Sequence, residues 1–533
     1  MDRATQPYDG PLHEDPAIHA RRWLLLGVMC LALVMIVMSV SGLNVALPAI
    51  QRDLDTTSTA LQWIVDAYSL VFAGLLLTAG ALGDRFGRRR ALLSGLGIFA
   101  VGALVAGVAT GSAQVIAGRV VMGLGAAFIM PATLSLITTV FPPQERRKAI
   151  AVWAGFAGAG GAIGPIVSGG LLEGFWWGSA LLVNIPVVAV VIAAVATFAP
   201  ESKDPGATPL DPAGAGLSLV GLGGLVFGII EGPVKGWTDA GVVAGFVAAV
   251  VCLGGFVVWE RRARHPMLPL GLFGDRRFSV GSGVVTSVFF AMFGFFFLYT
   301  QYLQFVRGDS PLTAGLATLP LAITLVAVAP RSAVLGERLG TGPVMAAGFV
   351  FVAAGFAVLA TVEPSTAYLV QAGALVLLGI GMSLTAAPAT GSIMSSVPPA
   401  KAGVGSAVND TTRELGGALG IAVLGSIVNA AYRSGLDLGG LDLPPPLADT
   451  ARESVGAATR GSAGVPGATE LASRAGDAFS QAFNLATGVS AVVALAAAAV
   501  VMATFGKRKE QAAEARAAEG SGGGHRPEVD VPA

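Results

Sequence analysis

The stretch ALGDRFGRRRALLSG, residues 81–95, places five charged side chains within seven positions of a chain that is otherwise poor in charge. Only 12% of the 533 residues are charged and 54% are hydrophobic, with a mean hydropathy of +0.72. An ordinary soluble domain carries about 25% charged residues, so this composition is typical of a membrane protein. The charges must therefore be interpreted by their position between apolar segments.

Apolar segments long enough to cross a bilayer, which needs about 20 residues per helix, recur along the whole chain. Cys30 and Cys252 both fall inside such segments, which excludes a disulfide framework and a cysteine metal site. The sequence predicts an all-α membrane protein with 14 transmembrane helices that begin near residues 23, 62, 91, 113, 148, 177, 213, 240, 279, 312, 343, 366, 404 and 482.

Lysine and arginine gather in alternate connections between these segments, as in DRFGRRR from residue 84, ERRK from 145, ERRAR from 260 and GKRK from 506. The short connections on the opposite side carry only Arg52, Lys235 and Arg307. Because short cytoplasmic loops are enriched in basic residues, we expect both termini to be cytoplasmic.

The opening stretch recurs 253 positions later as VLGERLGTGPVMAAG, residues 334–348. MPATLSLITTVFPP from residue 130 likewise matches APATGSIMSSVPP from 387, and GGAIGP from 160 matches GGALGI from 416. These matches predict two pseudo-repeated six-helix bundles with two extra central helices, an architecture of secondary transporters. The expected segments are a cytoplasmic N-terminal tail (1–22), the first half (23–200), two inserted linker helices (201–262), the second half (263–505, with an extracellular loop at 431–480) and a disordered cytoplasmic tail (506–533).

These motifs resemble the major facilitator superfamily, specifically its fourteen-helix drug:proton antiporter branch and the actinobacterial multidrug and antibiotic exporters within it. The signature between the second and third helices is present as Gly80, Leu82, Asp84, Arg85, Gly87, Arg88 and Arg89. A helix 4 motif is present as Arg119, Gly123 and Gly125, with Met122 where Gln is frequent. The antiporter motif of helix 5 is present as Gly160, Gly164, Pro165 and Gly169, with Ser168 where Gly is usual.

The first helix departs from the pattern of this branch. The branch commonly carries an Asp ahead of NVALP, but here the segment reads MSVSGLNVALP, so Ser39 replaces the Asp and Ser41 a Thr. If the proton coupling that the resemblance implies operates here, it must use other acids.

Few ionisable residues lie inside the predicted spans, and each is a functional candidate because a charge at the bilayer centre costs about 2.5 to 3.5 kcal/mol. Arg119 can bind a carboxylate and change its proton affinity, or it can be a static brace to backbone carbonyls. The acidic candidates for proton coupling each have a structural alternative: an interfacial position for Asp66, a solvated helix end for Glu231, and an ion pair with Arg413 for Asp410 and Glu414.

The repeat separates two roles for the charged signature. Both halves keep an acid-Arg-x-Gly core, whereas only the first half has the three arginines at 88–90, which we expect to act mainly as topology anchors. The glycine row of helix 5 is expected to pack against a partner helix, with Pro165 bending its own helix. The expected conformational latch comprises Gly80, Asp84, Arg85, Gly87, Arg88, Glu337 and Arg338.

The residues and the resemblance together predict proton-coupled efflux of hydrophobic or antibiotic-like small molecules across the bacterial plasma membrane by alternating access. No phosphate-binding Gly-x-x-x-x-Gly-Lys-Ser/Thr loop is present, which argues against ATP as energy source; we expect no enzyme activity, no metal and no cofactor besides the proton gradient. Expected partners are a small hydrophobic or amphipathic substrate, protons and the lipid bilayer, without nucleic acid, and the protein is expected to be a monomer. Two alternatives stay open: export of a self-made metabolite with self-resistance, and a non-transporting membrane sensor or scaffold.

Overall fold

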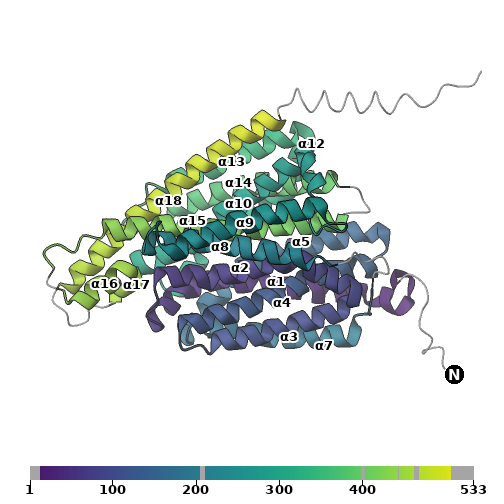
Figure 1. Ribbon diagram of the computed structural model, residues 1–533, viewed down its shortest axis with the longest axis horizontal. Helices are drawn as coiled ribbons and strands as arrows, with labels where there is room; N and C mark the ends of the chain where they lie inside the picture. Colours follow the sequence, from purple (N-terminus) through teal and green to yellow (C-terminus); the bar gives the residue numbers. More distant parts are fainter. Residues whose placement is uncertain (1–11, 204–209, 398–401, 442, 461–466, 506–533) are drawn as a thin grey trace, which may run out of the picture.

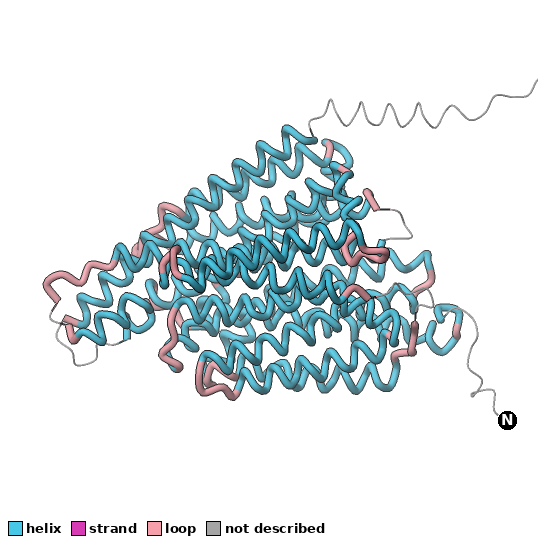
Figure 2. Tube along the Cα trace, viewed as in Figure 1, coloured by secondary structure: helices cyan, strands magenta, loops and turns pink. Residues whose placement is uncertain are grey.

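The computed structural model describes residues 12–203, 210–397, 402–441, 443–460 and 467–505. Helices make up nearly all of this trace, and the described residues contain no strand (Figure 2). Thirteen of the described helices are long and apolar enough to cross a membrane. The predicted class of all-α membrane protein is therefore confirmed, with 13 such helices where the sequence predicts 14.

The first half is built from long helices that pack side by side. Asp15 caps the first helix by accepting a hydrogen bond from the Ala17 N–H, and Thr57 caps the second in the same way through Ala60. The main helix pairs are α1 with α5, α3 with α4, and α2 with α4. The helices are α1 (Pro16–Asp53), α2 (Ser58–Phe86), α3 (Arg88–Gly107), α4 (Ser112–Val140), α5 (Pro143–Gly174), α6 (Ser179–Leu182) and α7 (Asn184–Phe198).

Two central helices, α8 (Pro212–Lys235) and α9 (Ala240–Arg262), form an antiparallel pair beside the two halves. Asp211 holds their shared end, because its carboxylate caps α8 through the Gly214 N–H at 2.8 Å and accepts the Trp259 indole N–H at 2.8 Å. One side of α8 packs on α2 and on α15 (Ala402–Gly435), whereas most of α9 is exposed. Such an apolar exposed helix is suited to lipid contact.

The second half follows the same long-helix plan (Figure 1). Its last part differs from the predicted loop at 431–480, because that range holds the end of one long helix, two short helices and the start of the last helix. The elements are η2 (Leu270–Gly274), α10 (Arg276–Gln301), η3 (Tyr302–Val306), α11 (Pro311–Leu316), α12 (Leu319–Leu339), α13 (Thr341–Leu359), α14 (Tyr368–Ser395), α15 (Ala402–Gly435), α16 (Pro445–Glu453), α17 (Val455–Arg460) and α18 (Ala468–Phe505).

Other predicted boundaries also shift. The first helix begins at Pro16, so it includes part of the expected tail 1–22; residues 1–11 and the expected tail 506–533 lie outside the described residues. We name the two ends of the bundle after the turns they hold: the 54–57 end carries the α1–α2 turn, and the Gly87 end carries the α2–α3 turn.

The turn at Gly87 has a counterpart at Gly340, between α12 and α13. Both glycines have positive φ angles, 124° and 90°, which favour glycine because it lacks a Cβ atom. Each donates its backbone N–H to the residue four positions earlier, Gly83 at 2.9 Å and Gly336 at 3.0 Å. The two copies of the motif, which lie 253 positions apart in the sequence, thus form the same helix-ending turn.

The 54–57 end is where most of the cross-half hydrogen bonds form. Toward the opposite, Gly87 end of the bundle, α18 inclines away from α3 and α7 (Figure 1). The bonds that join the halves include Ser58 Oγ to the Glu453 carbonyl (3.1 Å), Thr300 Oγ1 to the Asn44 carbonyl (2.8 Å), Gln304 Nε2 to the Val45 carbonyl (2.9 Å) and Leu312 N to Glu173 Oε1 (3.3 Å).

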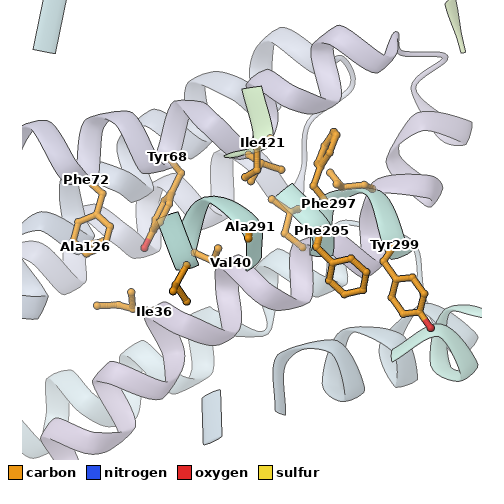
Figure 3. Packing of buried hydrophobic residues seen from close by; sticks show 14 of the residues in the cluster. Ile36, Val40, Tyr68, Phe72, Ala126, Ala291, Phe295, Phe297, Tyr299 and Ile421 are labelled. Atoms are coloured by element: carbon orange, nitrogen blue, oxygen red, sulfur yellow. The ribbon is translucent and has the colours of Figure 1, made fainter. Parts of the chain in front are cut away.

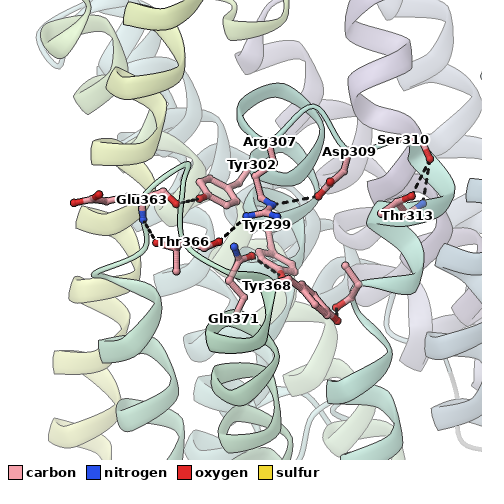
Figure 4. A network of polar contacts seen from close by, with 11 residues as sticks. Tyr299, Tyr302, Arg307, Asp309, Ser310, Thr313, Glu363, Thr366, Tyr368 and Gln371 are labelled. Atoms are coloured by element: carbon pink, nitrogen blue, oxygen red, sulfur yellow. Dashed lines mark hydrogen bonds and ion pairs between the residues drawn. The ribbon is translucent and has the colours of Figure 1, made fainter.

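At this end the second half is also held internally by a polar network (Figure 4). The Tyr299 hydroxyl lies 3.1 Å from Gln371 Oε1, and the Tyr302 hydroxyl donates to the Glu363 carbonyl at 3.0 Å. Arg307 donates to the Thr366 carbonyl at 2.8 Å and pairs with Asp309 at 3.4 Å. These bonds hold α10, η3 and the α13–α14 connection together. The surface of the second half that contacts the first half at this end is therefore held in place by internal hydrogen bonds.

Candidate functional site

Arg119 of α4 is completely buried at the contact between α4 and α2. Its Nε–H donates to the Ile64 carbonyl at 3.0 Å, and its guanidinium carbon lies 4.2 Å from the centre of the Tyr68 ring. Gly123, one turn further along α4, makes this approach possible because a Cβ atom there would lie 2.5 Å from the Tyr68 carbonyl oxygen. Nη1 and Nη2 make no hydrogen bond, so the guanidinium braces α2 and keeps two donor nitrogens for another partner.

Tyr68 connects this arginine to the other half of the molecule. Its ring lies 5.7 Å from that of Phe72, and Figure 3 shows both rings facing Ile36 and Val40 of α1. The buried Tyr68 hydroxyl makes no hydrogen bond, although Ser39 lies near it. Arg119, Arg413 and Glu414 are all close enough to interact electrostatically with Tyr68.

A charged cluster on α15 faces the first half. Arg413 lies 3.7 Å from Asp410 and 3.3 Å from Glu414, so one cation serves two carboxylates. The Arg413 Nη2 also lies 3.6 Å from the sulfur of Met130 on α4. We call Arg119, Tyr68, Asp410, Arg413 and Glu414 the central cluster; it joins α2 and α4 of the first half to α15 of the second.

Asp66 is completely buried, and neither of its carboxylate oxygens makes a hydrogen bond. It lies on α2 two residues from both Ile64 and Tyr68, which places it on the opposite side of the helix from Arg119. The structure therefore does not bring Asp66 and Arg119 together. It also does not place Asp66 at an exposed interfacial position.

Glu231 has two partners at the 54–57 end. The Trp63 indole N–H donates to it at 3.0 Å, and Lys235 pairs with it at 3.3 Å. Helix α8 continues through Pro233 to Lys235, so Glu231 is not at the helix end, and its side chain is only 13% exposed. The expectation of a solvated terminal carboxylate is wrong because the helix is one turn longer and α2 covers this residue.

The charged signature forms a tight corner at the Gly87 end. Asp84 and Arg88 pair at 2.7 Å, and the backbone of Gly80 lies against Pro131 of α4. Arg85 is exposed beside the Phe86 ring. In the second half Arg338 is exposed, and the side chain of Glu337 is outside what the structure describes.

Glu201 completes this corner and was not found by sequence reasoning. It follows α7 and accepts the Arg89 backbone N–H at 3.2 Å, so it caps the N-terminus of α3, and it lies 3.6 Å from the Arg90 side chain. A Cβ atom on Gly87 would lie 2.5 Å from Glu201 Oε1. A side chain at position 87 would therefore displace the Glu201 carboxylate, and glycine leaves room for it. The arginines at 88–90 therefore make specific contacts besides marking a loop.

The helix 5 glycines face two different helices. Gly160 and Gly164 pack on α1, where a Cβ at Gly164 would lie 2.9 Å from both the Gly42 nitrogen and the Met38 oxygen. A Cβ at Gly169 would lie 2.7 Å from the Pro311 carbonyl oxygen, and one at Gly315 would lie 2.5 Å from the Pro165 carbonyl oxygen. The motif thus packs α5 on α1 within its half and on α11 across the halves.

Comparison with known proteins assigns this architecture. The family model described as "Major Facilitator Superfamily" matches residues 29–421. The chain belongs to the Major Facilitator Superfamily. As a member of this superfamily it is a multi-pass membrane transporter and not an enzyme.

Relatives of this superfamily member extend over most of its length. It is 37% identical to "Multidrug efflux pump LfrA" of Mycolicibacterium smegmatis over 91% of this chain and 96% of that protein. It is 33% identical to "Tetracenomycin C resistance and export protein" of Streptomyces glaucescens over 80% of each. A crystal structure of a bacterial homologue of the human lysosomal transporter Spinster, inward-facing and unoccupied, matches with a TM-score of 0.65 at 18% identity, covering 92% of this chain and 98% of that one; it shows the fold.

Within this superfamily fold, the structure places Arg119 on Ile64 and Tyr68, and it pairs Asp410 and Glu414 with Arg413. It does not pair Arg119 with any of the four predicted acids. Tyr68 is the residue of the central cluster that sequence reasoning missed. A buried tyrosine in an apolar helix resembles ordinary packing, and only the α2–α4 contact shows that it carries Arg119 on its face.

Proposed function

We propose that this transporter exports hydrophobic or antibiotic-like small molecules from a bacterial cell, and that inward proton flow through the plasma membrane drives it. The observation that supports this most directly is the central cluster, where ionisable groups of both halves meet inside the bundle. The printed names of the relatives from Mycolicibacterium and Streptomyces support export of small molecules. A monomer contains the complete cluster.

The orientation follows from the basic connections. If loops rich in arginine are cytoplasmic, the Gly87 end faces the cytoplasm and the 54–57 end faces outward. The cross-half hydrogen bonds gather at the outer end, which supports an inward-facing conformation. Helix α5, with 32 residues and a length of about 48 Å, is proposed as the fourteenth span, paired with α1.

The proposed two-bundle repeat is supported by equivalent local packing. Besides the matching turns at Gly87 and Gly340, α15 packs on α10 through Gly416 and Gly420 as α5 packs on α1 through its own glycines. Two similar bundles joined by a central pair of helices suit alternating access, in which the halves rock about a shared site.

Proton binding would act through Arg413. Two acids compete for this one guanidinium, so a proton on either Asp410 or Glu414 leaves Arg413 with a single ionic partner. Arg413 also contacts Met130 and interacts with Tyr68 of the first half. Proton binding therefore changes the contacts across the halves, and a change that differs between conformations shifts their populations.

The Asp84 corner is proposed as the latch at the cytoplasmic end. Arg88 holds Asp84 in this inward-facing conformation, while Glu201 fixes the start of α3. Release of Asp84 to another partner would favour the opposite conformation. A second candidate function, export of a self-made metabolite, is favoured by the name of the relative from Streptomyces glaucescens.

Drug-susceptibility profiling of a sensitive host that expresses the chain tests the proposal. Expression should raise the inhibitory concentration of a group of amphipathic compounds, and a protonophore should remove this protection. Resistance that persists after collapse of the proton gradient would exclude proton coupling. Absence of protection against any compound, with the protein present in the membrane, would count against export of foreign molecules.

A further inference from the structure

The face of α2 that carries Asp66 is buried in a seam with two other helices. Residues 62, 66 and 70 follow each other at the spacing of one helical turn and share a face. A Cβ atom on Gly425 of α15 would collide with the amide of Gln62, and Leu70 packs with Ala422 of α15 and Ile230 of α8. Asp66 lies between these two contacts, so it faces the α2–α15–α8 seam.

This seam joins the halves. Helix α2 belongs to the first half and α15 to the second, and they pack closely, with Gly425 against Gln62 and Asn429 bonded to Thr59. Rocking of the halves must open or slide this contact, so the surroundings of Asp66 change in the transport cycle.

The seam offers Asp66 no compensating partner. Both of its oxygens lack hydrogen bonds, and so do Ser69 Oγ, one turn deeper on the same face, and Gln62 Oε1, one turn closer to the outer end. A buried carboxylate without a partner is costly, and a neutral carboxyl is less so. Three buried polar groups without hydrogen bonds along one face of a membrane-spanning helix are unusual.

Charged groups of the neighbouring helices are otherwise engaged or distant along the seam. On α8, Glu231 pairs with Lys235. On α4, Arg119 contacts the opposite side of α2. Toward the outer end α15 carries Arg433, and deeper in the bundle it carries the Asp410–Arg413–Glu414 cluster.

Two small cavities lie at the outer end of this seam, and one of them is lined by Gln62. One of about 20 Å³ is lined by Ser58, Gln62, Gln301 and Asn429 among others, and a site of about 10 to 15 Å³ already accommodates a water. A second, of about 220 Å³, is lined by Trp63 and also reaches Asn429. Gln62, which lines the first cavity, is one helical turn from Asp66.

Deeper along the seam the same faces lead toward the central cluster. On α15, residues 425, 422, 418 and 414 share a face by helical spacing, so Glu414 lies on the side of α15 that turns toward α2. Asp66 is therefore an intermediate position between the outer cavities and Glu414.

We propose that Asp66 is the outer proton acceptor of the antiport cycle, which takes up a proton from water beside Gln62 when the α2–α15 seam opens and passes it inward past the Ser69 hydroxyl toward Glu414. The inference rests on the proposed proton coupling. A proton leaves a hydronium ion on the outer side and forms an O–H bond with one carboxylate oxygen of Asp66. That bond breaks again when the proton moves to water or to the next acceptor, so no other reactant is needed.

Everted membrane vesicles that contain the full chain test this proposal, with ethidium as the probe. Respiration acidifies the lumen, which corresponds to the outer side, and an acridine dye reports proton release when ethidium is added. Wild type should release protons. Asp66→Asn should fall to the level of vesicles without the protein, Asp66→Glu should retain part of the response, and Glu363→Gln, an exposed carboxyl at the same end, should match wild type.

Exchange of labelled against unlabelled ethidium, measured without a proton gradient, separates coupling from folding. Asp66→Asn should keep this exchange at the wild-type rate. Proton release by Asp66→Asn equal to wild type would overturn the proposal and leave proton coupling intact. Loss of exchange in both Asp66→Asn and Asp66→Glu would overturn it in favour of a structural role. Ethidium exchange by wild type without proton release would refute proton coupling itself, and this proposal with it.

Discussion

Replacement of Gly169 by Ala should shift the transporter from this conformation, which we propose is inward-facing, to the outward-facing one. The added Cβ would lie 2.7 Å from the Pro311 carbonyl oxygen and 2.8 Å from the Leu312 Cα. Both are backbone atoms, so neither can rotate away. Overpacking of this kind costs about 1 to 3 kcal/mol, which corresponds to a shift of about 5- to 150-fold in a two-state equilibrium. The cost falls on this conformation because α5 and α11 belong to different halves.

Two glycines on the same helix are matched controls. A Cβ atom on Gly170 would have no neighbour within 4 Å, so Gly170→Ala should leave the equilibrium unchanged. Gly164 is as crowded as Gly169, but its neighbours Met38 and Gly42 are in the same half. Gly164→Ala should therefore lower the amount of folded protein without changing the balance between conformations.

The assay is the rate at which a membrane-impermeant maleimide modifies a cysteine placed at Gln301, in a chain whose Cys30 and Cys252 are replaced by Ala. Gln301 lies on α10 beside the outer seam and is only 3% exposed in this conformation. Its labelling rate should rise with the outward-facing population in Gly169→Ala. Equal rates in Gly169→Ala and Gly170→Ala would refute the assignment of the α5–α11 contact to one conformation.

Three further changes have defined outcomes. Gly425→Ala should raise the same labelling rate less than Gly169→Ala, because only the flexible end of Gln62 stands in the way. Arg119→Ala should abolish efflux while the protein stays in the membrane, since it removes a buried cation–π contact of about 2 kcal/mol together with two unpaired donors; full efflux by this variant would show that Arg119 is only a brace. Asp84→Asn should slow efflux with topology intact, whereas Arg90→Gln should have little effect because its side chain is 73% exposed; the reverse order would contradict the latch.

The fold is largely predictable because helices that cross a membrane need long apolar segments, which are easy to recognise in a sequence. Apolar length gave the helices, and the recurring signature gave equivalent turns at Gly87 and Gly340. The helix that holds the last span begins at Ala468, 14 residues before the predicted start of the apolar span near residue 482. Its first turns carry Glu470, Arg474 and Asp477, and a helix that extends beyond the bilayer does not need to be apolar.

The candidate site was predicted as a set of residues but not as a set of partners. Buried Arg119 and the acids of α15 were conspicuous because charge is rare in such helices. Their relation to Tyr68 and Met130, and the capping of α3 by Glu201, depend on how separate helices align, which no local sequence pattern records.

The glycine motif shows how one packing device serves two different seams. GGAIGPIVSG at 160–169 and GGALGIAVLG at 416–425 have glycines at the same positions. In each, the first and third glycines pack within their own half, on α1 or α10, and the last glycine packs across the halves. The last glycine of the first copy packs against the backbone of α11, which cannot move aside by rotation. The last glycine of the second copy packs against the side chain of Gln62, which can change its rotamer. The α5–α11 contact is therefore suited to a fixed stop, and the α2–α15 seam to small adjustments. A carboxyl that must alternate between exposure and burial belongs in the adjustable seam, and Asp66 lies there, one turn from Gln62.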